Sequence, residues 1–158
     1  MVSLRTSAVD APDARALLEE YFALRAAIFP GGSYRTVFPS PETFVEPAGV
    51  FVVLDDDEGR PVGCGGIRRI ADGPLGPRDE VKHLFVRDAG RGQGWGRAIL
   101  DDLERRARER GAAELVLDTH HTLEAAGGLY ARSGFASIEA YNDNTNATRW
   151  YAKPLTPQ

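Results

Sequence analysis

Arg91-Gly-Gln-Gly-Trp-Gly-Arg97 is the stretch that says most about the fold of this chain. An apolar run typical of a strand, 81–86, precedes it, and a run with helical character, 98–110, follows it. Glycines at alternate positions allow a ligand to approach the backbone closely. Backbone N–H groups at the start of a helix, together with the helix dipole, favour bound anions. The stretch therefore predicts a phosphate-binding loop between a strand and a helix.

Three kinds of phosphate-binding loop compete for this stretch. A P-loop has a lysine and a hydroxyl residue after its last glycine, whereas Gly96 is followed by arginine and alanine. A dinucleotide loop needs a third glycine three residues after the second, and that spacing is broken here, although Asp118 ends the next strand as that fold requires. The third pattern is arginine or glutamine, two residues, glycine, one residue, then glycine or alanine. Arg91, Gly94 and Gly96 match it.

The third pattern resembles the acyl-CoA pyrophosphate loop of the GNAT N-acetyltransferase superfamily. Downstream, Gly128-Leu-Tyr-Ala-Arg-Ser-Gly-Phe135 is similar to the second motif of that family, in which Leu-Tyr near the end of a helix is followed by Gly-Phe. Upstream, Glu80-Val-Lys-His-Leu-Phe-Val86 resembles the central strand, and Pro61-Val-Gly-Cys-Gly-Gly66 resembles the strand before it. Two motifs in the right order make the resemblance specific, and together the segments cover residues 50–155.

The resemblance implies an α+β fold with a mixed, mostly antiparallel sheet of about seven strands and about four flanking helices. The central strands of this fold splay apart at the cofactor. With 158 residues the chain is long enough for a substantial core, and we expect one N-acetyltransferase domain over 1–158.

Hydrophobic periodicity predicts the elements of this domain. Strands are expected at 2–9, 50–54, 61–70, 81–86, 114–118, 135–141 and 148–152. We expect a first helix that Asp10 caps. Its inward stripe is expected to consist of Leu17, Leu18, Tyr21, Leu24, Arg25 and Ile28. Further helices are expected at 41–45, 98–110 and 123–132. The glycine- and proline-rich segment 71–79 is expected to be a turn.

Composition narrows the class of partner and the compartment. The net charge of −4 argues against nucleic-acid binding as the main function. The single cysteine, Cys64, excludes an internal disulfide and lies in a strand pattern, so we expect a small buried residue. The N-terminus lacks the apolar core of a signal peptide, and the longest apolar run, 50–54, is too short to cross a bilayer. We therefore expect a cytoplasmic protein with no membrane partner.

The resemblance implies transfer of an acetyl group from acetyl-CoA, as co-substrate, to a primary amine of a small molecule or peptide. Direct attack in a ternary complex is expected. The pantetheine arm would pair with the backbone of Leu84, Phe85 and Val86. The pyrophosphate would bind to the loop residues Arg91, Gly92, Gln93, Gly94, Trp95, Gly96 and Arg97.

Tyr130 corresponds to the tyrosine that protonates the leaving thiolate in this family. Outside the Leu-Tyr…Gly-Phe context, a helix tyrosine packed in the core with a satisfied hydroxyl would be the better interpretation. Within that context we predict that Tyr130 is the general acid.

Glu80 is the candidate base, because it lies eleven positions before Arg91, as the base glutamate does in histone-acetylating members of the superfamily. Strand alternation predicts that Glu80, Lys82, Leu84 and Val86 share one face. The alternative is an ion pair between Glu80 and Lys82, which would weaken the carboxylate as a base. Both interpretations stay open.

His120 and His121 follow the strand that ends at Asp118, where substrates approach in this fold, so either could relay a proton. Exposure in a loop is the simpler expectation for both, and His83 is expected to be structural. Leu123 stands where many family members have an asparagine that contacts the cofactor. No cluster of His, Cys, Asp and Glu has metal-ligand spacing, so no metal site is predicted.

A non-catalytic acyl-CoA sensor is the alternative function, and a nucleotide-dependent oxidoreductase is a weaker one. The expected partner is a small-molecule or peptide amine, and no nucleic acid is expected. A homodimer is left open as an oligomeric state. Aromatic and cationic residues in the expected acceptor wall hint at an anionic or amino-acid-like acceptor. These residues are Tyr21, Arg25, Phe29, Tyr34 and Arg35.

Overall fold

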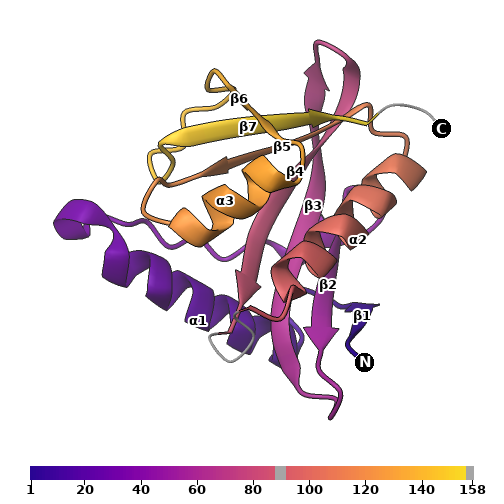
Figure 1. Cartoon of the computed structure of the whole chain (residues 1–158), viewed down its shortest axis with the longest axis vertical. Coiled ribbons are helices and arrows are strands. Elements are labelled where there is room, and N and C mark those ends of the chain that lie inside the picture. Colours follow the sequence, from indigo (N-terminus) through magenta and orange to yellow (C-terminus); the bar gives the residue numbers. More distant parts are fainter. Residues whose placement is uncertain (88–91, 156–158) are drawn as a thin grey trace.

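One sheet of seven strands forms the centre of the protein, seen in a computed structural model that describes residues 1–87 and 92–155 (Figure 1). The strands are β1 (Ser3–Thr6), β2 (Gly49–Asp55), β3 (Pro61–Gly73), β4 (Gly76–Val86), β5 (Glu114–Thr119), β6 (Ala136–Ile138) and β7 (Arg149–Pro154). Their order in the sheet is β1-β2-β3-β4-β5-β7-β6. Only β4 and β5 run parallel, and the other neighbours are antiparallel. The expected mixed, mostly antiparallel sheet is confirmed.

Three α-helices flank the sheet in the described part: α1 (Pro12–Ile28), α2 (Trp95–Glu109) and α3 (Glu124–Arg132). Two short 3-10 helices, η1 (Pro30–Gly32) and η2 (Pro41–Phe44), follow α1. The expectation of about four helices is therefore corrected to three, because segment 30–48 forms only single turns. Among the described helices, none is both long enough and apolar enough to cross a membrane.

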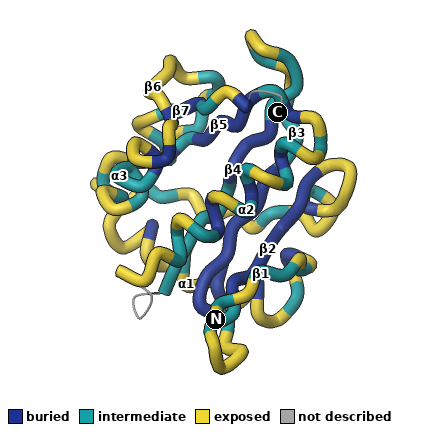
Figure 2. Tube along the Cα trace, turned by 45° about the vertical axis from the view of Figure 1, so that its right-hand side comes forward, coloured by how far each residue is buried: buried dark blue, intermediate teal, exposed yellow. Residues whose placement is uncertain are grey.

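Two hydrophobic cores lie on opposite faces of the sheet, and Figure 2 shows the buried strands between them. The core on one face contains side chains of α2 and α3, and the core on the other contains side chains of α1 and η2. In α1 the apolar stripe is buried at Leu17 and Leu18, but Leu24 and Ile28 are 38% and 37% exposed. The predicted stripe is therefore correct at Leu17, Leu18 and Arg25, and wrong at Leu24 and Ile28.

β3 and β4 form a long hairpin where the sequence suggested a turn at 71–79. Gly73 pairs with Gly76, so only Pro74 and Leu75 connect the strands. Gly76 has φ +123, a conformation that side chains rarely allow. The glycines and the proline thus serve a two-residue connection, and residues 76–80 belong to the strand.

β1 and β6 are shorter than the sequence predicts. After Thr6 the chain turns into α1, whose N-cap is Ala11 and not Asp10, with no side-chain capping bond. β6 stops at Ile138, before the stretch that brings Tyr141 toward β4.

The sheet opens between β4 and β5. Their parallel pairing is limited to Arg78, Asp79 and Glu80 on β4, opposite Glu114, Leu115 and Val116 on β5. Beyond Glu80 the two strands diverge, which confirms the expected splay. Backbone N–H and C=O groups on this edge of β4 have no strand partner among the described residues and can form hydrogen bonds with a ligand.

β4 carries a bulge just after the opening begins. Two residues, His83 and Leu84, lie opposite one residue of β3, and His83 has φ +59. An inserted residue reverses the alternation of side chains along a strand. Leu84 and Val86 accordingly pack with the core beneath α2, whereas Glu80 and Lys82 belong to the α1 face. The prediction that these four side chains share one face is wrong.

Candidate active site

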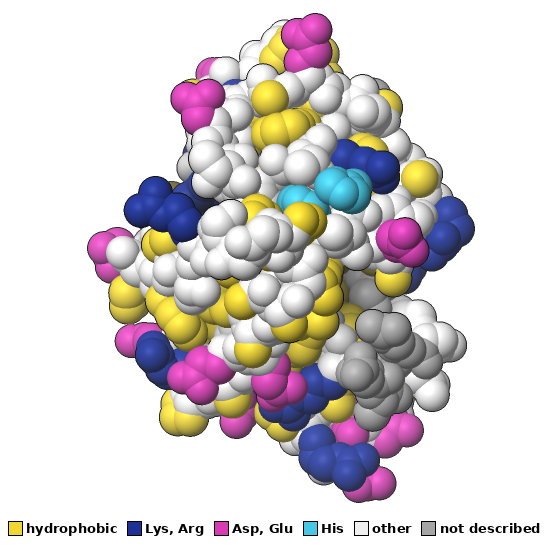
Figure 3. Space-filling view, turned by 90° about the vertical axis from the view of Figure 1, so that its left-hand side faces the viewer, with side chains coloured by type: hydrophobic (Ala, Val, Ile, Leu, Met, Phe, Trp, Pro, Cys, Tyr) yellow, Lys and Arg dark blue, Asp and Glu magenta, His cyan; other side chains and the backbone are white. Residues whose placement is uncertain are grey.

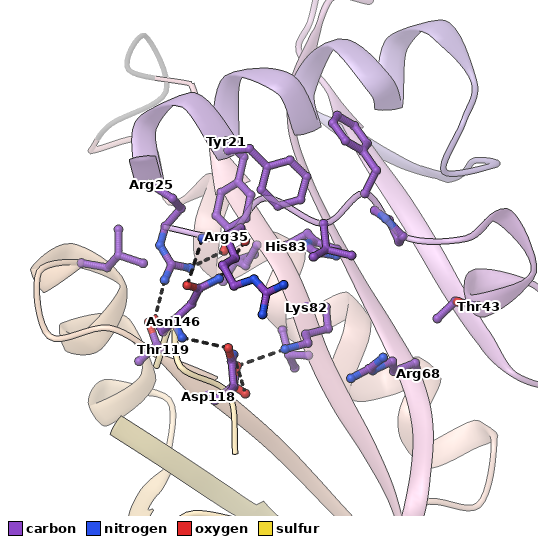
Figure 4. Close-up of a pocket in the computed structure, with 18 of the residues that line it drawn as sticks. Tyr21, Arg25, Arg35, Thr43, Arg68, Lys82, His83, Asp118, Thr119 and Asn146 are labelled. Carbon is purple, nitrogen blue, oxygen red and sulfur yellow. Dashed lines mark hydrogen bonds and ion pairs between the residues drawn. The ribbon is translucent and has the colours of Figure 1, made fainter. Parts of the chain in front are cut away.

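A cavity of about 470 Å³ lies at the opening between β4 and β5 (Figure 4). Its walls come from α1, the segment that follows α1, the strands β3 to β5, α3 and the turn after β6. The cavity thus lies where the backbone of β4 is no longer paired with β5. Segments distant in the sequence therefore meet around one concave, partly open space, which is the usual form of a small-molecule site.

Charged side chains are concentrated on the α1 side of this cavity. Arg25, Arg35, Arg68 and Lys82 line it, together with one acid, Asp118. Lys82 Nζ lies 3.1 Å from Asp118 Oδ1 and 3.9 Å from the carboxylate of Glu80. The cavity therefore has an excess of positive charge.

Asp118 is held as an acceptor by three donors. Besides Lys82, the side-chain amides of Asn142 and Asn144 donate to its Oδ2 at 2.7 and 3.1 Å. Burial alone would raise the pKa of Asp118, but Lys82 and these two amides outweigh it and lower the pKa. Asp118 is thus a fixed carboxylate and a weak proton acceptor.

The turn at 142–146 is a part of the site that the sequence analysis does not identify, because the segment lies between two predicted strands and matches no motif. Three asparagines, Asn142, Asn144 and Asn146, are linked in sequence. The side-chain oxygen of Asn142 accepts the backbone N–H of Asn144, and that of Asn144 accepts the backbone N–H of Asn146. The indole of Trp150 donates to Asn142 Oδ1 and fixes the first of the three asparagines. Asparagines at alternate positions were the available signal.

Glu80 is 1% exposed and lies beside the cavity without lining it. Arg68 Nε donates to its Oε1 at 2.8 Å, and the Tyr141 hydroxyl donates to its Oε2 at 2.5 Å. Lys82, the partner suggested by the sequence, is nearer to Asp118. The structure thus gives Glu80 two close partners that the sequence did not indicate, Arg68 and Tyr141.

Tyr130 lines the cavity from α3 and is 5% exposed. Its ring packs against Phe135 and Tyr151, with centroids 5.8 and 6.0 Å away. Burial raises the pKa of Tyr130, so the phenol keeps its proton at neutral pH. No hydrogen bond of its hydroxyl to another described residue is present in the structure, which leaves that proton available to a ligand.

The three histidines occupy different environments. His83 lines the cavity, and burial, with the charges of Lys82, Arg68 and Arg25 as further causes, lowers its pKa to about 3. It is a neutral group and a very weak base.

His120 and His121 stack on each other with centroids 4.4 Å apart, and neither lines the described cavity. Exposure was expected for both, but His120 is 4% exposed because Phe29 packs on it and Thr122 bonds its Nδ1. His121 is exposed, and Figure 3 shows histidine on that surface.

The glycine loop is open where the sequence predicts the phosphate cradle. Gly92 and Gly94 have φ +78 and +76, and a side chain at either would meet no atom within 4 Å. α2 begins at Trp95 without a side-chain cap, so its first N–H groups are free to bind an anion. Arg97 points to solvent and pairs with Asp101 at 3.1 Å. Arg91 lies outside the described residues.

Cys64 is buried on the α1 face, as expected. Burial raises the pKa of its thiol, which keeps it protonated and unreactive. In residues 1–87 and 92–155, no three His, Cys, Asp or Glu side chains are grouped so that they could hold a metal ion.

Comparisons with known proteins give one answer about the family. The model of the acetyltransferase (GNAT) family matches residues 14–135, which is most of the chain. An uncharacterised N-acetyltransferase of Schizosaccharomyces pombe is 33% identical over 100 residues, which cover 62% of this chain and 58% of that protein. An "IAA acetyltransferase" of Azospirillum brasilense is 32% identical over 120 residues, which cover 76% of this chain and 74% of that protein.

Solved structures agree on the fold. An acetyltransferase of the GNAT family from Staphylococcus aureus superposes with a TM-score of 0.80, over 99% of this chain and all of that one. The sequence identity of 18% limits this likeness to the fold.

Proposed function

This chain belongs to the acetyltransferase (GNAT) family, and we propose that it transfers an acetyl group from acetyl-CoA to a primary amine of a small molecule or peptide. The amine attacks the thioester carbonyl directly while both substrates are bound. A C–N bond forms, the C–S bond breaks, one proton leaves the amine and one proton reaches the thiolate. The main observation behind this proposal is the opening between β4 and β5. At this opening one cavity is lined both by residues of α1 and by Tyr130 of α3.

The chain's own residues fit the two polar parts of acetyl-CoA. Gly92 and Gly94 present an open, left-handed backbone at the start of α2, which suits a pyrophosphate. Gln93, Trp95, Gly96 and Arg97 complete the described part of this cradle, and Arg91 stays a prediction. The backbone of Leu84, Phe85 and Val86, unpaired on its β5 side, suits the amides of the pantetheine arm.

Tyr130 is proposed as the general acid. Tyr130 lines the cavity, and its hydroxyl keeps its proton and has no competing partner among the described residues. It can therefore donate to the sulfur as the C–S bond breaks.

Glu80 is proposed as the base that takes the amine proton through a water. Its buried carboxylate does not line the cavity, so direct contact with the amine is unfavourable. Arg68 and Tyr141 both donate to this carboxylate and hold it in place beside the cavity. Among the other candidates, His83 is too weak a base, and neither His120 nor His121 lines the cavity.

Turnover of an amine panel with the purified protein tests the function, and Tyr130→Phe tests the assignment. This change removes one hydroxyl and keeps the ring. General acids contribute about 10²–10⁴-fold, so kcat should fall by that order while acetyl-CoA affinity is unchanged. A Tyr130→Phe enzyme with the wild-type kcat when chemistry is limiting would remove Tyr130 from the mechanism.

Calorimetry with acetyl-CoA tests the cradle separately. Gly94→Val should abolish measurable binding, because its side chain fills the open space at φ +76. Gly111→Val is the matched control, since Gly111 has φ +82 and an equally open environment at the other end of α2. Equal affinity of the two variants would contradict the cradle. Acetyl-CoA binding without turnover of any amine would instead identify an acyl-CoA sensor.

A further inference from the structure

Two of the four cations that line the cavity are already neutralised by carboxylates. Arg68 pairs with Glu80 at 2.8 Å, and Lys82 pairs with Asp118 at 3.1 Å. Glu80 and Asp118 are themselves buried or nearly so. These pairs add no net charge to the cavity, so they do not explain its positive character.

The remaining two cations, Arg25 and Arg35, have no carboxylate partner among the described residues. Arg25 is 7% exposed, and its guanidinium lies 5.0 Å from the centre of the Tyr34 ring. It donates to the Tyr21 hydroxyl at 3.0 Å and to the Asn146 carbonyl at 2.9 Å. A guanidinium buried with neutral acceptors alone leaves an uncompensated positive charge at this wall.

Arg35 is fixed by its backbone and free at its side chain. Its N–H donates to Asn146 Oδ1 at 3.3 Å, and its carbonyl accepts from Asn146 Nδ2 at 2.9 Å. No hydrogen bond or ion pair of its guanidinium to a described residue is present. Figure 4 shows Arg35 pointing into the space bordered by Lys82, Asp118 and Arg68. Asn146 is thus a positioning residue that presents Arg35 to the cavity.

Building on the proposed function, we propose that the acceptor amine carries an anionic group, a carboxylate or a phosphonate, and that Arg35 binds this group. A guanidinium binds such an oxyanion through two parallel N–H donors, which fixes orientation as well as affinity. Arg25 adds positive charge behind it. With its anionic end at Arg35, the acceptor extends its amine toward the opening between β4 and β5. The site therefore selects amino-acid-like amines over simple amines.

The test uses pairs of amines that differ only in the anionic group. Tyrosine and tyramine, histidine and histamine, and arginine and agmatine each differ by one carboxylate. Aminomethylphosphonate and glycine, compared with methylamine, separate phosphonate from carboxylate recognition. Acetylation with acetyl-CoA and direct binding by calorimetry are measured for each compound. At least one anionic compound should be acetylated with kcat/KM about tenfold or more above its neutral partner.

Three variants assign the preference to Arg35. Arg35→Gln should raise KM for the preferred anionic amine by about tenfold to a hundredfold and leave kcat and the neutral partner unchanged. Arg35→Lys should recover part of the loss, because charge returns without the two-donor geometry. Arg105→Gln removes the same charge from an exposed position on α2 and should change neither amine.

The outcomes separate this inference from the proposed function. Acetylation of neutral amines with no anionic preference, or an Arg35→Gln effect equal on both members of a pair, overturns the inference and leaves the acetyltransferase intact. Failure of every amine to bind or react overturns both. A preference that survives Arg35→Gln also overturns the inference, because the anion is then bound elsewhere.

Discussion

Asp79 and Glu80 are neighbours on β4 with nearly the same local chemistry and different surroundings. They are 0% and 1% exposed, and each lies 2.8 Å from the Nε of an arginine on β3, Arg69 or Arg68. Because side chains alternate along a strand, the two carboxylates face opposite sides of the sheet. The sequence Asp-Glu therefore places the same ion pair twice, once on each face.

The Asp79 side is closed. Arg110 also donates to Asp79, from Nε at 3.0 Å, and its other nitrogens reach the carboxylate of Glu46 and the carbonyl of Pro47. Arg69 in turn donates to the Arg110 carbonyl at 3.0 Å. The group ties β3 and β4 to the end of α2 and to the segment before β2, which is a structural role.

The Glu80 side is open. Arg68 is 40% exposed at its side chain and lines the cavity, so the pair faces a space that a ligand can enter. The contrast teaches that a buried carboxylate–arginine pair is not a functional signal by itself. What lies beyond the pair decides whether it ties elements together or belongs to a site.

Glu80→Gln should produce the largest change. As the proposed base, its loss lowers kcat at neutral pH by about 10²–10⁴-fold, with partial recovery at high pH, where free amine is abundant. Measured pH–rate profiles of wild type and variant decide this. If Glu80 acts only as Asp79 does, stability falls and the profile keeps its shape.

Asp79→Asn should chiefly cost stability, by about 3 kcal/mol, because Arg69 loses its charged partner and Arg110 loses one of its two in a buried setting. Urea unfolding measures the loss, and kcat of the folded protein should stay near wild type. Glu109→Gln is the control, since it breaks an exposed pair with Arg105 worth less than about 1 kcal/mol. Equal losses in the two variants would refute a structural role for Asp79.

His83 makes the Glu80 side sensitive to acid. Burial, then the nearby cations Lys82, Arg68 and Arg25, lower the folded-state pKa to about 3. Between pH 6.5 and about 3 the unfolded chain binds a proton that the folded chain does not, so stability falls as pH falls through this window. The contribution is up to about 1.4 kcal/mol per pH unit.

His83→Asn removes this titration and keeps a residue that tolerates the φ of +59. Unfolding measured from pH 7 to pH 4 should show a flatter pH dependence in the variant than in the wild type. Parallel curves for the two proteins would mean that His83 is protonated in the folded state.

Tyr141→Phe should have the smallest effect, a loss of about 1 kcal/mol, because it removes the hydroxyl that donates to Glu80 and leaves the ring over Arg78. Chemical denaturation gives the value. If the loss of unfolding free energy is as large as that of Asp79→Asn, the Glu80 group stabilises the fold as much as the Asp79 group does.

The sequence predicts the strands of the sheet because they follow from hydrophobic periodicity, and the splay because two motifs in order carry the family resemblance; the glycine cradle stays a prediction. The prediction from sequence fails at the bulge, since the extra residue at His83 has no local signal and exchanges the faces of everything after it. It also fails at 71–79, where glycine and proline mark a two-residue connection as readily as a long loop.

The candidate site was predictable only along single segments. The position of Tyr130 at the cavity could be predicted because its sequence neighbours match a family motif, and its role as the acid stays a prediction. Other parts of the site arise from contacts between segments up to 61 residues apart in the sequence. These are the bonds of Asn142 and Asn144 to Asp118, and those of Arg68 and Tyr141 to Glu80. No sequence spacing predicts such contacts, because the path of the loops determines which residues meet.

The three-residue pairing of β4 with β5 also has a consequence for the stability of the folded protein. A continuous sheet would satisfy its backbone internally, but here part of the β4 edge has no strand partner among the described residues, and a bound molecule can complete it. A ligand that binds only the folded state stabilises it by RT ln(1 + [L]/Kd), about 2.7 kcal/mol at a hundredfold excess over Kd. If the proposed binding of acetyl-CoA is correct, resistance to unfolding and proteolysis should rise with acetyl-CoA concentration, which thermal unfolding at increasing acetyl-CoA measures.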